Sequence, residues 1–329
     1  MSMRPINVPV SFFGMVLGLV GLGDCWRVAT LAWGMPAQIA QGVMLLSFAL
    51  WAVLTVFYIG KWLLNRAEAL AEWHDPLQGC FVGLAAVATL LAGIAIAPLH
   101  HSLALVLFVV GSISQLAYAV YFTGRLWRGE RAVGTVSAAL YLPTVAGNFV
   151  SAFCAGYFGY PDIGVLFLGA GFLSWLSLES VITHRLAHHS TLPAPMRPTL
   201  GIMLAPPAVG CVGYLFVTGG LAGGPVDLFA QLLLGYALLQ LAFLVGLLPW
   251  ITRQPFTASY WAFSFGVTAL AFDSIVFVLR GQKGFMEWLS VGLFGLANLL
   301  IATLVVLTLW RLLTGKLLPP PILQPNEYG

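Results

Sequence analysis

Few residues in the apolar middle of this chain could carry chemistry, and one helical face gathers two of them. At 100° per residue, one narrow face of the run 256–279 collects Ala262, Phe265, Gly266, Ala269 and Asp273. Small residues on such a face allow a neighbouring helix to approach closely or line a cavity. Phe265 is the bulky ring on this face, so it either packs like any other aromatic side chain or plugs an opening.

Ionisable side chains inside apolar runs are the other candidates, because isolated charge is costly in a bilayer and is usually functional there. Asp273 could be a proton-coupling or ion-coupling group, or it could make only a structural hydrogen bond. Glu179 is better explained by a structural hydrogen bond than by transport. Asp24 and Arg27 could pair with each other or lie at the membrane interface.

The sequence offers little support for a metal site or for enzyme chemistry. His184 and His188 have the i, i+4 spacing of two ligands on one helical face, but no third ligand is evident, so we expect no metal. No nucleophile–base–acid set and no phosphate-binding glycine loop is recognisable, so we expect neither an enzyme nor a cofactor. The basic residues are scattered singly, which argues against a nucleic-acid partner.

Composition places most of the chain inside a lipid bilayer. The chain is 60% hydrophobic and 8% charged, with a mean hydropathy of +0.94, whereas soluble domains carry about 25% charged residues. Apolar runs long enough to cross a bilayer occupy residues 10–32, 37–62, 77–97, 99–123, 134–156, 163–187, 198–219, 227–248, 256–279 and 285–312. We therefore predict an all-α integral membrane protein with ten transmembrane helices.

These runs form a repeat. Short turns join the two runs of each pair, and the pairs begin roughly every 60 residues, which is typical of a repeat architecture. We predict five tandem helical hairpins around a central pore, within a single domain over residues 10–316. Residues 1–9 and the proline-rich tail 317–329 are expected to flank this domain.

The first run of each pair is richer in Gly and Pro than the second. Interior prolines free backbone carbonyls that lipid cannot satisfy, so kinked segments belong against protein or a water-filled cavity. We predict five kinked first helices inside and five straighter second helices facing lipid. Besides Ala262, Gly266 and Ala269, the predicted pore lining comprises Gly14, Gly18, Pro143, Gly147 and Pro206. For Gly14 and Gly18, a small-xxx-small packing contact is the alternative.

Charge predicts the orientation and the kind of conduit. All but three of the 14 Lys and Arg residues fall on the side of the two termini and of the loops between hairpins. The positive-inside rule therefore predicts that both termini are cytoplasmic. A ring of kinked helices without a ring of charges predicts a narrow, mostly uncharged conduit. A passive channel is the simpler interpretation, because Asp273 is the one serious candidate for a coupling site.

Several segments resemble a known family, and they follow one another in order over almost the whole chain. They are SFFGMVLGL (Ser11–Leu19), YLPTVAGNF (Tyr141–Phe149), GYPDIGVLFLGAGFLSWLSLE (Gly159–Glu179), RPTLGIMLAPPAV (Arg197–Val209), WAFSFG (Trp261–Gly266) and WRLLTGKL (Trp310–Leu317). The family includes the bacterial tellurite-resistance protein TehA, the plant guard-cell slow anion channel and yeast malate permeases.

The resemblance implies a channel for small monovalent anions such as chloride and nitrate in the bacterial inner membrane, built as a homotrimer with a pore in each subunit. It also implies a phenylalanine gate on the ninth helix. The second Phe of WAFSFG, Phe265, matches that gate, whereas Phe263 should face away. The alternative is a proton-coupled carrier or exporter for tellurite-like oxyanions or C4-dicarboxylates, with Asp273 as the titrating group.

Overall fold

Ten helices long and apolar enough to span a membrane account for most of the described residues. The structure, a computed structural model, describes residues 8–129 and 133–318. Its α-helices are α1 (Phe13–Trp33), α2 (Ala37–Leu64), α3 (Arg66–His74), α4 (Gln78–Ile96), α5 (His101–Trp127), α6 (Gly147–Tyr157), α7 (Pro161–His188), α8 (Ala205–Val217), α9 (Leu228–Ile251), α10 (Ser264–Leu279) and α11 (Phe285–Leu313). All ten apolar runs predicted from the sequence are confirmed as candidate spans, with ends that agree within four residues. Most of the predicted flanking segments, residues 1–7 and 319–329, lies outside the described residues.

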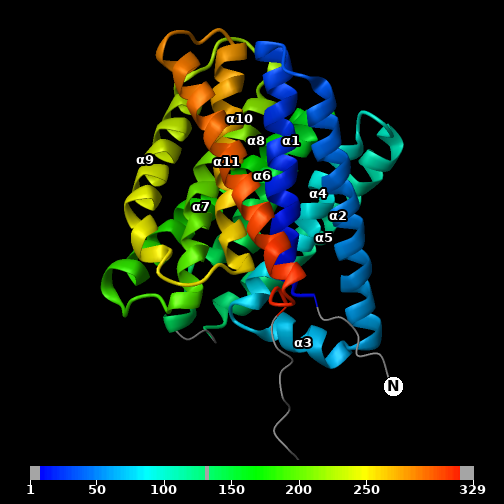
Figure 1. The fold of residues 1–329 in the computed structure, drawn as a ribbon, viewed down its shortest axis with the longest axis vertical. Coiled ribbons are helices and arrows are strands. Elements are labelled where there is room, and N and C mark those ends of the chain that lie inside the picture. The colour runs from blue at the N-terminus through cyan, green and yellow to red at the C-terminus, as the bar shows by residue number, and fades with distance from the viewer. Residues whose placement is uncertain (1–7, 130–132, 319–329) are drawn as a thin grey trace, which may run out of the picture.

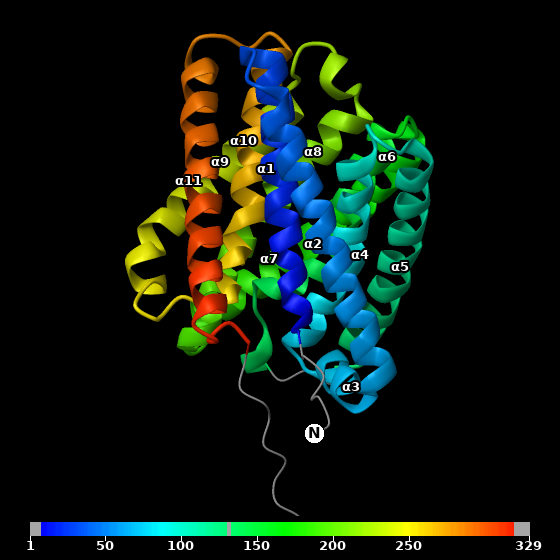
Figure 2. The same cartoon turned by 45° about the vertical axis from the view of Figure 1, so that its right-hand side comes forward.

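The spans form two concentric rings, as the Gly and Pro pattern predicts. Each first helix packs against the first helix of the hairpins beside it, in the closed order α1, α4, α6, α8, α10 and back to α1. In the most apolar 18-residue stretch of each first span, 78–94% of the residues are buried. In the corresponding stretch of each second span, only 17–39% of the residues are buried. The outer helices α2, α5, α7, α9 and α11 each pack on their own hairpin partner (Figures 1 and 2).

Two inner helices, α6 and α8, begin irregularly at prolines. Pro143 lies in a π-helical turn, Leu142–Ala146, that leads into α6. A 3-10 segment, Ala194–Leu204, precedes α8, whose first turn holds Pro206 and Pro207. Proline has no N–H to donate, so it is accommodated in the first turn of a helix, where that N–H would have no partner, or in an irregular turn. Irregular helical turns therefore occur around these prolines, in the half of the inner ring where α1 begins.

The short helix α3 lies across the end of the bundle where α1 begins (Figure 2). The segment predicted as a loop between the first two hairpins therefore contains a helix. The Glu72 carboxylate on α3 pairs with Lys61 Nζ at 3.0 Å and accepts a hydrogen bond from the Val10 N–H at 2.8 Å. Lys61 is buried, so this pair fixes α3 to the end of α2 and to the start of the first span.

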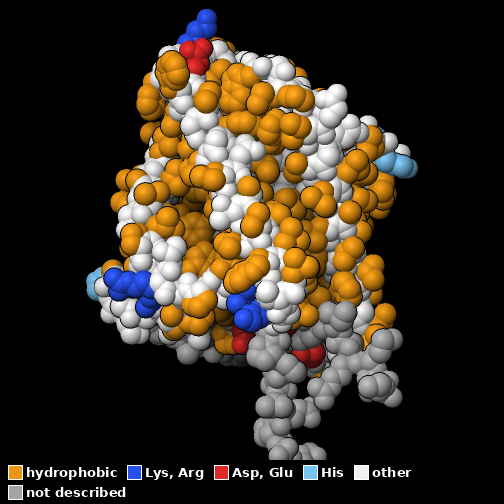
Figure 3. All heavy atoms as spheres, in the orientation of Figure 1, with side chains coloured by type: hydrophobic (Ala, Val, Ile, Leu, Met, Phe, Trp, Pro, Cys, Tyr) orange, Lys and Arg blue, Asp and Glu red, His pale blue; other side chains and the backbone are white. Residues whose placement is uncertain are grey.

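The outer surface matches a bilayer. Figure 3 shows hydrophobic side chains over the middle of the face in view, with Lys, Arg, Asp and Glu near its two ends. The exposed apolar residues come largely from the second helices, for example Leu46, Val56, Val120, Leu166 and Leu299. The chain is therefore a multi-pass membrane protein.

Candidate pore and its constriction

A cavity of about 220 Å³, here called the wide cavity, lies inside the ring in the half where α1 begins. Each inner span contributes one stripe of residues to it: Gly14 and Leu17, Phe81 and Leu84, Leu142 and Ala146, Ile202 and Ala205, and Trp261 and Ala262. Ser11, Gln78, Thr199 and Ser259 supply polar groups. The wide cavity is thus mostly apolar, with a few hydrogen-bonding side chains that could replace part of an ion's hydration shell.

A second cavity continues along the same inner helices toward the other end of the ring. This narrow cavity is about 20 Å³, room for about one water molecule. On α1 the lining passes from Gly14 and Leu17 to Gly21 and Asp24, a spacing of three and four residues that keeps to one helical face. Later residues of the other inner helices complete it: Leu91, Phe153, Val209, Val212, Thr268, Ala269 and Phe272. The two cavities are therefore successive sections of one axis.

Phe265 separates the two sections. Within the described part of the chain, it is the one residue that lines both cavities. Gly21 on α1 lies opposite, where a Cβ would be 3.5 Å from Phe265 Cδ2. The backbone around the ring is fixed, because the Thr268 hydroxyl donates to the carbonyls of Ser264 and Phe265 at 3.0 and 3.1 Å. Phe263 packs instead against Gly201 and lines neither cavity.

The structure brings some predicted lining residues to the axis and places others at helix contacts. Gly14, Ala262 and Ala269 line a cavity. Gly18, Gly147 and Gly266 do not, because added Cβ atoms there would meet Ser264 of α10, Gln115 of α5 and Leu204 before α8, respectively. For Gly18, this corrects the pore-lining prediction in favour of the packing alternative.

The two predicted prolines do not line either cavity, but the residues before them do. Pro143 and Pro206 are buried and lie outside both linings. Leu142 and Ala205, the residues before them, face the wide cavity instead. The prolines therefore shape the helices that carry the lining without forming its surface.

Asp273 lies outside both cavities. The stripe of α10 that faces the axis runs through Ala262, Phe265, Ala269 and Phe272, which turns Asp273 toward α8. Asp273 is fully buried, and neither carboxylate oxygen has a hydrogen bond of standard geometry; the weak donor beside it is the Cys211 thiol. The face of α10 predicted from the sequence therefore differs by part of a helical turn from the face that meets the axis.

Glu179 is part of a hydrogen-bond network between helices. Its carboxylate accepts from the Tyr141 hydroxyl at 2.5 Å, the Trp175 indole N–H at 2.7 Å and the Tyr236 hydroxyl at 2.9 Å. These donors lie just before α6, on α7 and on α9. The network supports the structural interpretation of Glu179 over a transport role.

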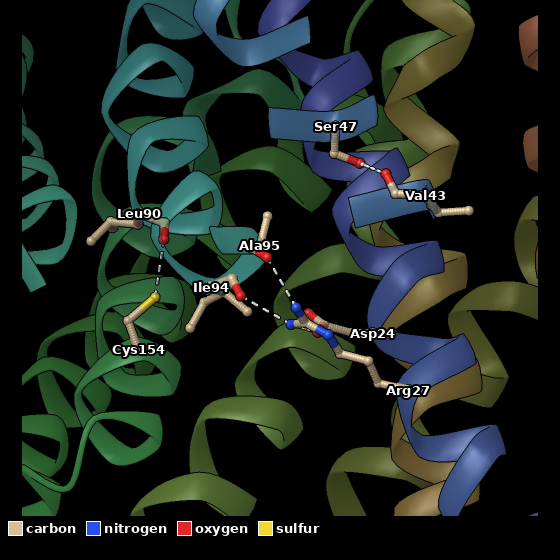
Figure 4. Close-up of polar contacts among 8 residues, drawn as sticks. All are labelled: Asp24, Arg27, Val43, Ser47, Leu90, Ile94, Ala95 and Cys154. Atoms are coloured by element: carbon tan, nitrogen blue, oxygen red, sulfur yellow. Dashed lines mark hydrogen bonds and ion pairs between the residues drawn. The ribbon is translucent and has the colours of Figure 1, made fainter. Parts of the chain in front are cut away.

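Asp24 is a charged lining residue that sequence reasoning did not place at the axis. Among the described residues that line either cavity, it is the one with a charged side chain. Its carboxylate pairs with Arg27 at 3.2 Å, and Arg27 also donates to the Ile94 and Ala95 carbonyls at 2.9 and 3.0 Å (Figure 4). The spacing of Gly14, Leu17, Gly21 and Asp24 shows that they share one helical face, but it does not show that this face is turned toward the axis.

Comparison with known proteins agrees with this architecture. The family model described as "Voltage-dependent anion channel" (SLAC1) matches residues 7–309. A protein of Haemophilus influenzae named "Tellurite resistance protein TehA homolog" is 32% identical over 316 residues, covering 95% of this chain and 93% of that protein. The "S-type anion channel SLAH3" of Arabidopsis thaliana is 25% identical over 317 residues, 92% of this chain and 48% of that protein.

An archaeal relative extends the comparison beyond bacteria and plants. The "Uncharacterized transporter MJ0576" of Methanocaldococcus jannaschii is 23% identical over 301 residues, 85% of this chain and 86% of that protein. The family match covers nearly all ten spans, including the helices that line both cavities. The chain therefore belongs to the SLAC1 family of channels and transporters, which are not enzymes.

Proposed function

We propose that this protein is an anion channel whose pore follows the axis of the two cavities and is closed by the Phe265 ring. The single observation that carries the proposal is that Phe265 lines both the wide and the narrow cavity. All five inner spans of the chain line the wide cavity, which supports a pore within each subunit. Membership of an anion-channel family supports anions as the permeating ions.

The proposed gate works by excluding water. An ion that reaches Phe265 from the wide cavity must shed hydration, and the ring offers no polar group in exchange. A hydrophobic constriction of this kind closes a pore by dewetting. Beyond the ring, space for about one water molecule leaves no room for a hydrated ion. Removing the ring joins the two cavities without touching a charged residue.

The finer features of the proposal rest on the family resemblance and on the charge pattern. We propose chloride and nitrate as the permeating anions, a homotrimeric assembly, and a bacterial inner-membrane location with both termini cytoplasmic. The wide cavity then faces the cytoplasm, because it lies in the half of the ring where α1 begins. Cross-linking of the purified protein in detergent tests the trimer, and proteolysis in oriented vesicles tests the side of the termini.

Current recordings test the gate. We expect wild-type protein to be almost silent in chloride and nitrate solutions and Phe265→Ala to conduct anions. Phe263→Ala is the matched control, because it also removes a phenyl ring. The Phe263 ring lies two residues from Phe265 and packs on Gly201 outside both cavities. A silent Phe265→Ala protein that is folded and in the membrane would refute the gate, as would equal currents from both variants.

The alternative, proton-coupled transport of oxyanions or C4-dicarboxylates, has one observation in its favour. Asp273 is a fully buried carboxyl group without a standard hydrogen bond, two turns beyond Phe265 on α10. Asp273 lines neither cavity, so a proton would have to reach it through packed side chains. The channel is therefore the better-supported function, and loss of flux in Asp273→Asn would reverse that preference.

A further inference from the structure

The narrow cavity presents a carboxylate to the proposed path of an anion. Asp24 lies one turn beyond Gly21, which faces the Phe265 ring, and lines the same cavity as that ring. The remaining described lining residues of both cavities are uncharged. An anion that passes the gate therefore next meets a group of its own sign. A channel for anions needs a physical reason to keep such a group there.

Arg27 fixes the position of this carboxylate and reduces its charge only in part. Residue 98 is a proline, so the Ile94 carbonyl at the end of α4 has no i+4 N–H to accept from. The Leu99 N–H donates to Ile96, which also leaves the Ala95 carbonyl without its helical partner. Arg27 satisfies both carbonyls at 2.9 and 3.0 Å, whereas its contact with Asp24 is longer, at 3.2 Å (Figure 4).

The pair is therefore a fixed dipole with its negative end toward the path. Arg27 is anchored to the end of α4 and does not line either cavity, whereas Asp24 does. Arg280, at the end of α10, is held by the Leu215 and Gly220 carbonyls and also lies outside both linings. Among the described residues that line the two cavities, Asp24 is the one with a charged side chain.

We propose that Asp24, held by Arg27, is a valence filter that admits monovalent anions and rejects divalent ones. This inference rests on the proposed channel function and names the residue that sets its specificity. The repulsion between a fixed carboxylate and a passing ion scales with the charge of the ion. Partial compensation by Arg27 keeps the barrier low for one negative charge, and a second negative charge doubles it.

The size of the expected effect follows from a partly compensated charge at close range. In a confined site the interaction between unit charges a few ångströms apart changes an equilibrium by one or more factors of ten. With Arg27 opposing it, the extra charge of a divalent anion should lower permeation about tenfold relative to a monovalent anion. Nitrate and chloride carry the same charge, so their ratio should not depend on Asp24.

Reversal potentials in the conducting Phe265→Ala background test the filter. With sulfate on one side and chloride on the other, Phe265→Ala/Asp24→Asn should show a sulfate-to-chloride permeability ratio about tenfold higher than Phe265→Ala alone. The nitrate-to-chloride ratio should stay the same. Asp162→Asn is the matched control, because Asp162 is an exposed acid in the first turn of α7.

The outcomes separate this inference from the proposed function. Anion currents in Phe265→Ala with an unchanged sulfate ratio in Asp24→Asn would overturn the filter and leave the channel intact. Equal shifts of the sulfate and nitrate ratios would also overturn it, since they indicate a deformed pore. A silent Phe265→Ala background would overturn both proposals. If Asp24→Asn does not fold, Asp24→Thr must show the same rise and Asp24→Glu must keep the ratio low.

Discussion

Replacing Gly18 by Ala should weaken the contact between α1 and α10 beside the proposed gate. A Cβ at position 18 would lie 2.5 Å from Ser264 Cβ and 3.1 Å from the Trp261 ring. The Ser264 hydroxyl is held by the Trp261 carbonyl at 2.6 Å and cannot easily move aside. The two helices must therefore separate by about 1 Å, and overpacking of this kind costs about 1–3 kcal/mol.

Substitutions of two other glycines serve as controls for the packing cost of Gly18→Ala. Gly42 on α2 faces open space, and Gly14 on α1 has its nearest neighbour, Leu84 Cδ1, at 4.0 Å. All three substitutions gain the higher helix propensity of Ala, up to about 1 kcal/mol. The difference between Gly18→Ala and either control therefore reports packing alone.

Thermal unfolding of the purified protein in detergent measures this difference. We expect Gly18→Ala to unfold at a temperature several degrees below Gly14→Ala and Gly42→Ala. Because Ser264 precedes Phe265, Gly18→Ala should also shift the ring and produce a small anion leak. A Gly18→Ala protein as stable as both controls would refute the packing argument for this residue.

Two further substitutions distinguish structural acids from transport groups. Glu179→Gln puts an amide NH2 group where the carboxylate accepts hydrogen bonds from Tyr141, Trp175 and Tyr236. The free energy of unfolding should therefore fall by about 1–3 kcal/mol, and an unchanged unfolding temperature would contradict the structural role of Glu179. Because an unpartnered ionised carboxylate is costly to bury, the Asp273→Asn protein should fold as well as wild type. Added to Phe265→Ala, the Asp273→Asn substitution should leave the anion current unchanged. Loss of that current would favour a coupled carrier.

Hydropathy and repeat length were sufficient to predict the spans and the hairpins. Each span is a long apolar run, and its length is set by the bilayer. The inner and outer rings also followed from composition, since Pro143 and Pro206 free backbone groups that only protein or water can satisfy. Helix α3 was missed because it is short and amphipathic and takes its place from the Glu72–Lys61 pair.

The face that each inner helix turns to the axis was harder to predict. Gly18 and Gly21 are equally small, and both face α10, but only Gly21 reaches the narrow cavity. On α4, the lining residues Phe81, Leu84 and Leu91 cannot be told from core residues by type. The rotation of a helix within a ring is set by its neighbours on both sides, which a single sequence does not display.

A graded series at position 265 tests the central claim most directly. Anion current should rise in the order Phe, Leu, Val, Ala as the side chain that divides the cavities shrinks. Phe272→Ala removes a ring from the narrow cavity without opening the division, so it should stay closed. Currents that do not follow side-chain size at position 265, or a conducting Phe272→Ala protein, would contradict a pore closed by Phe265.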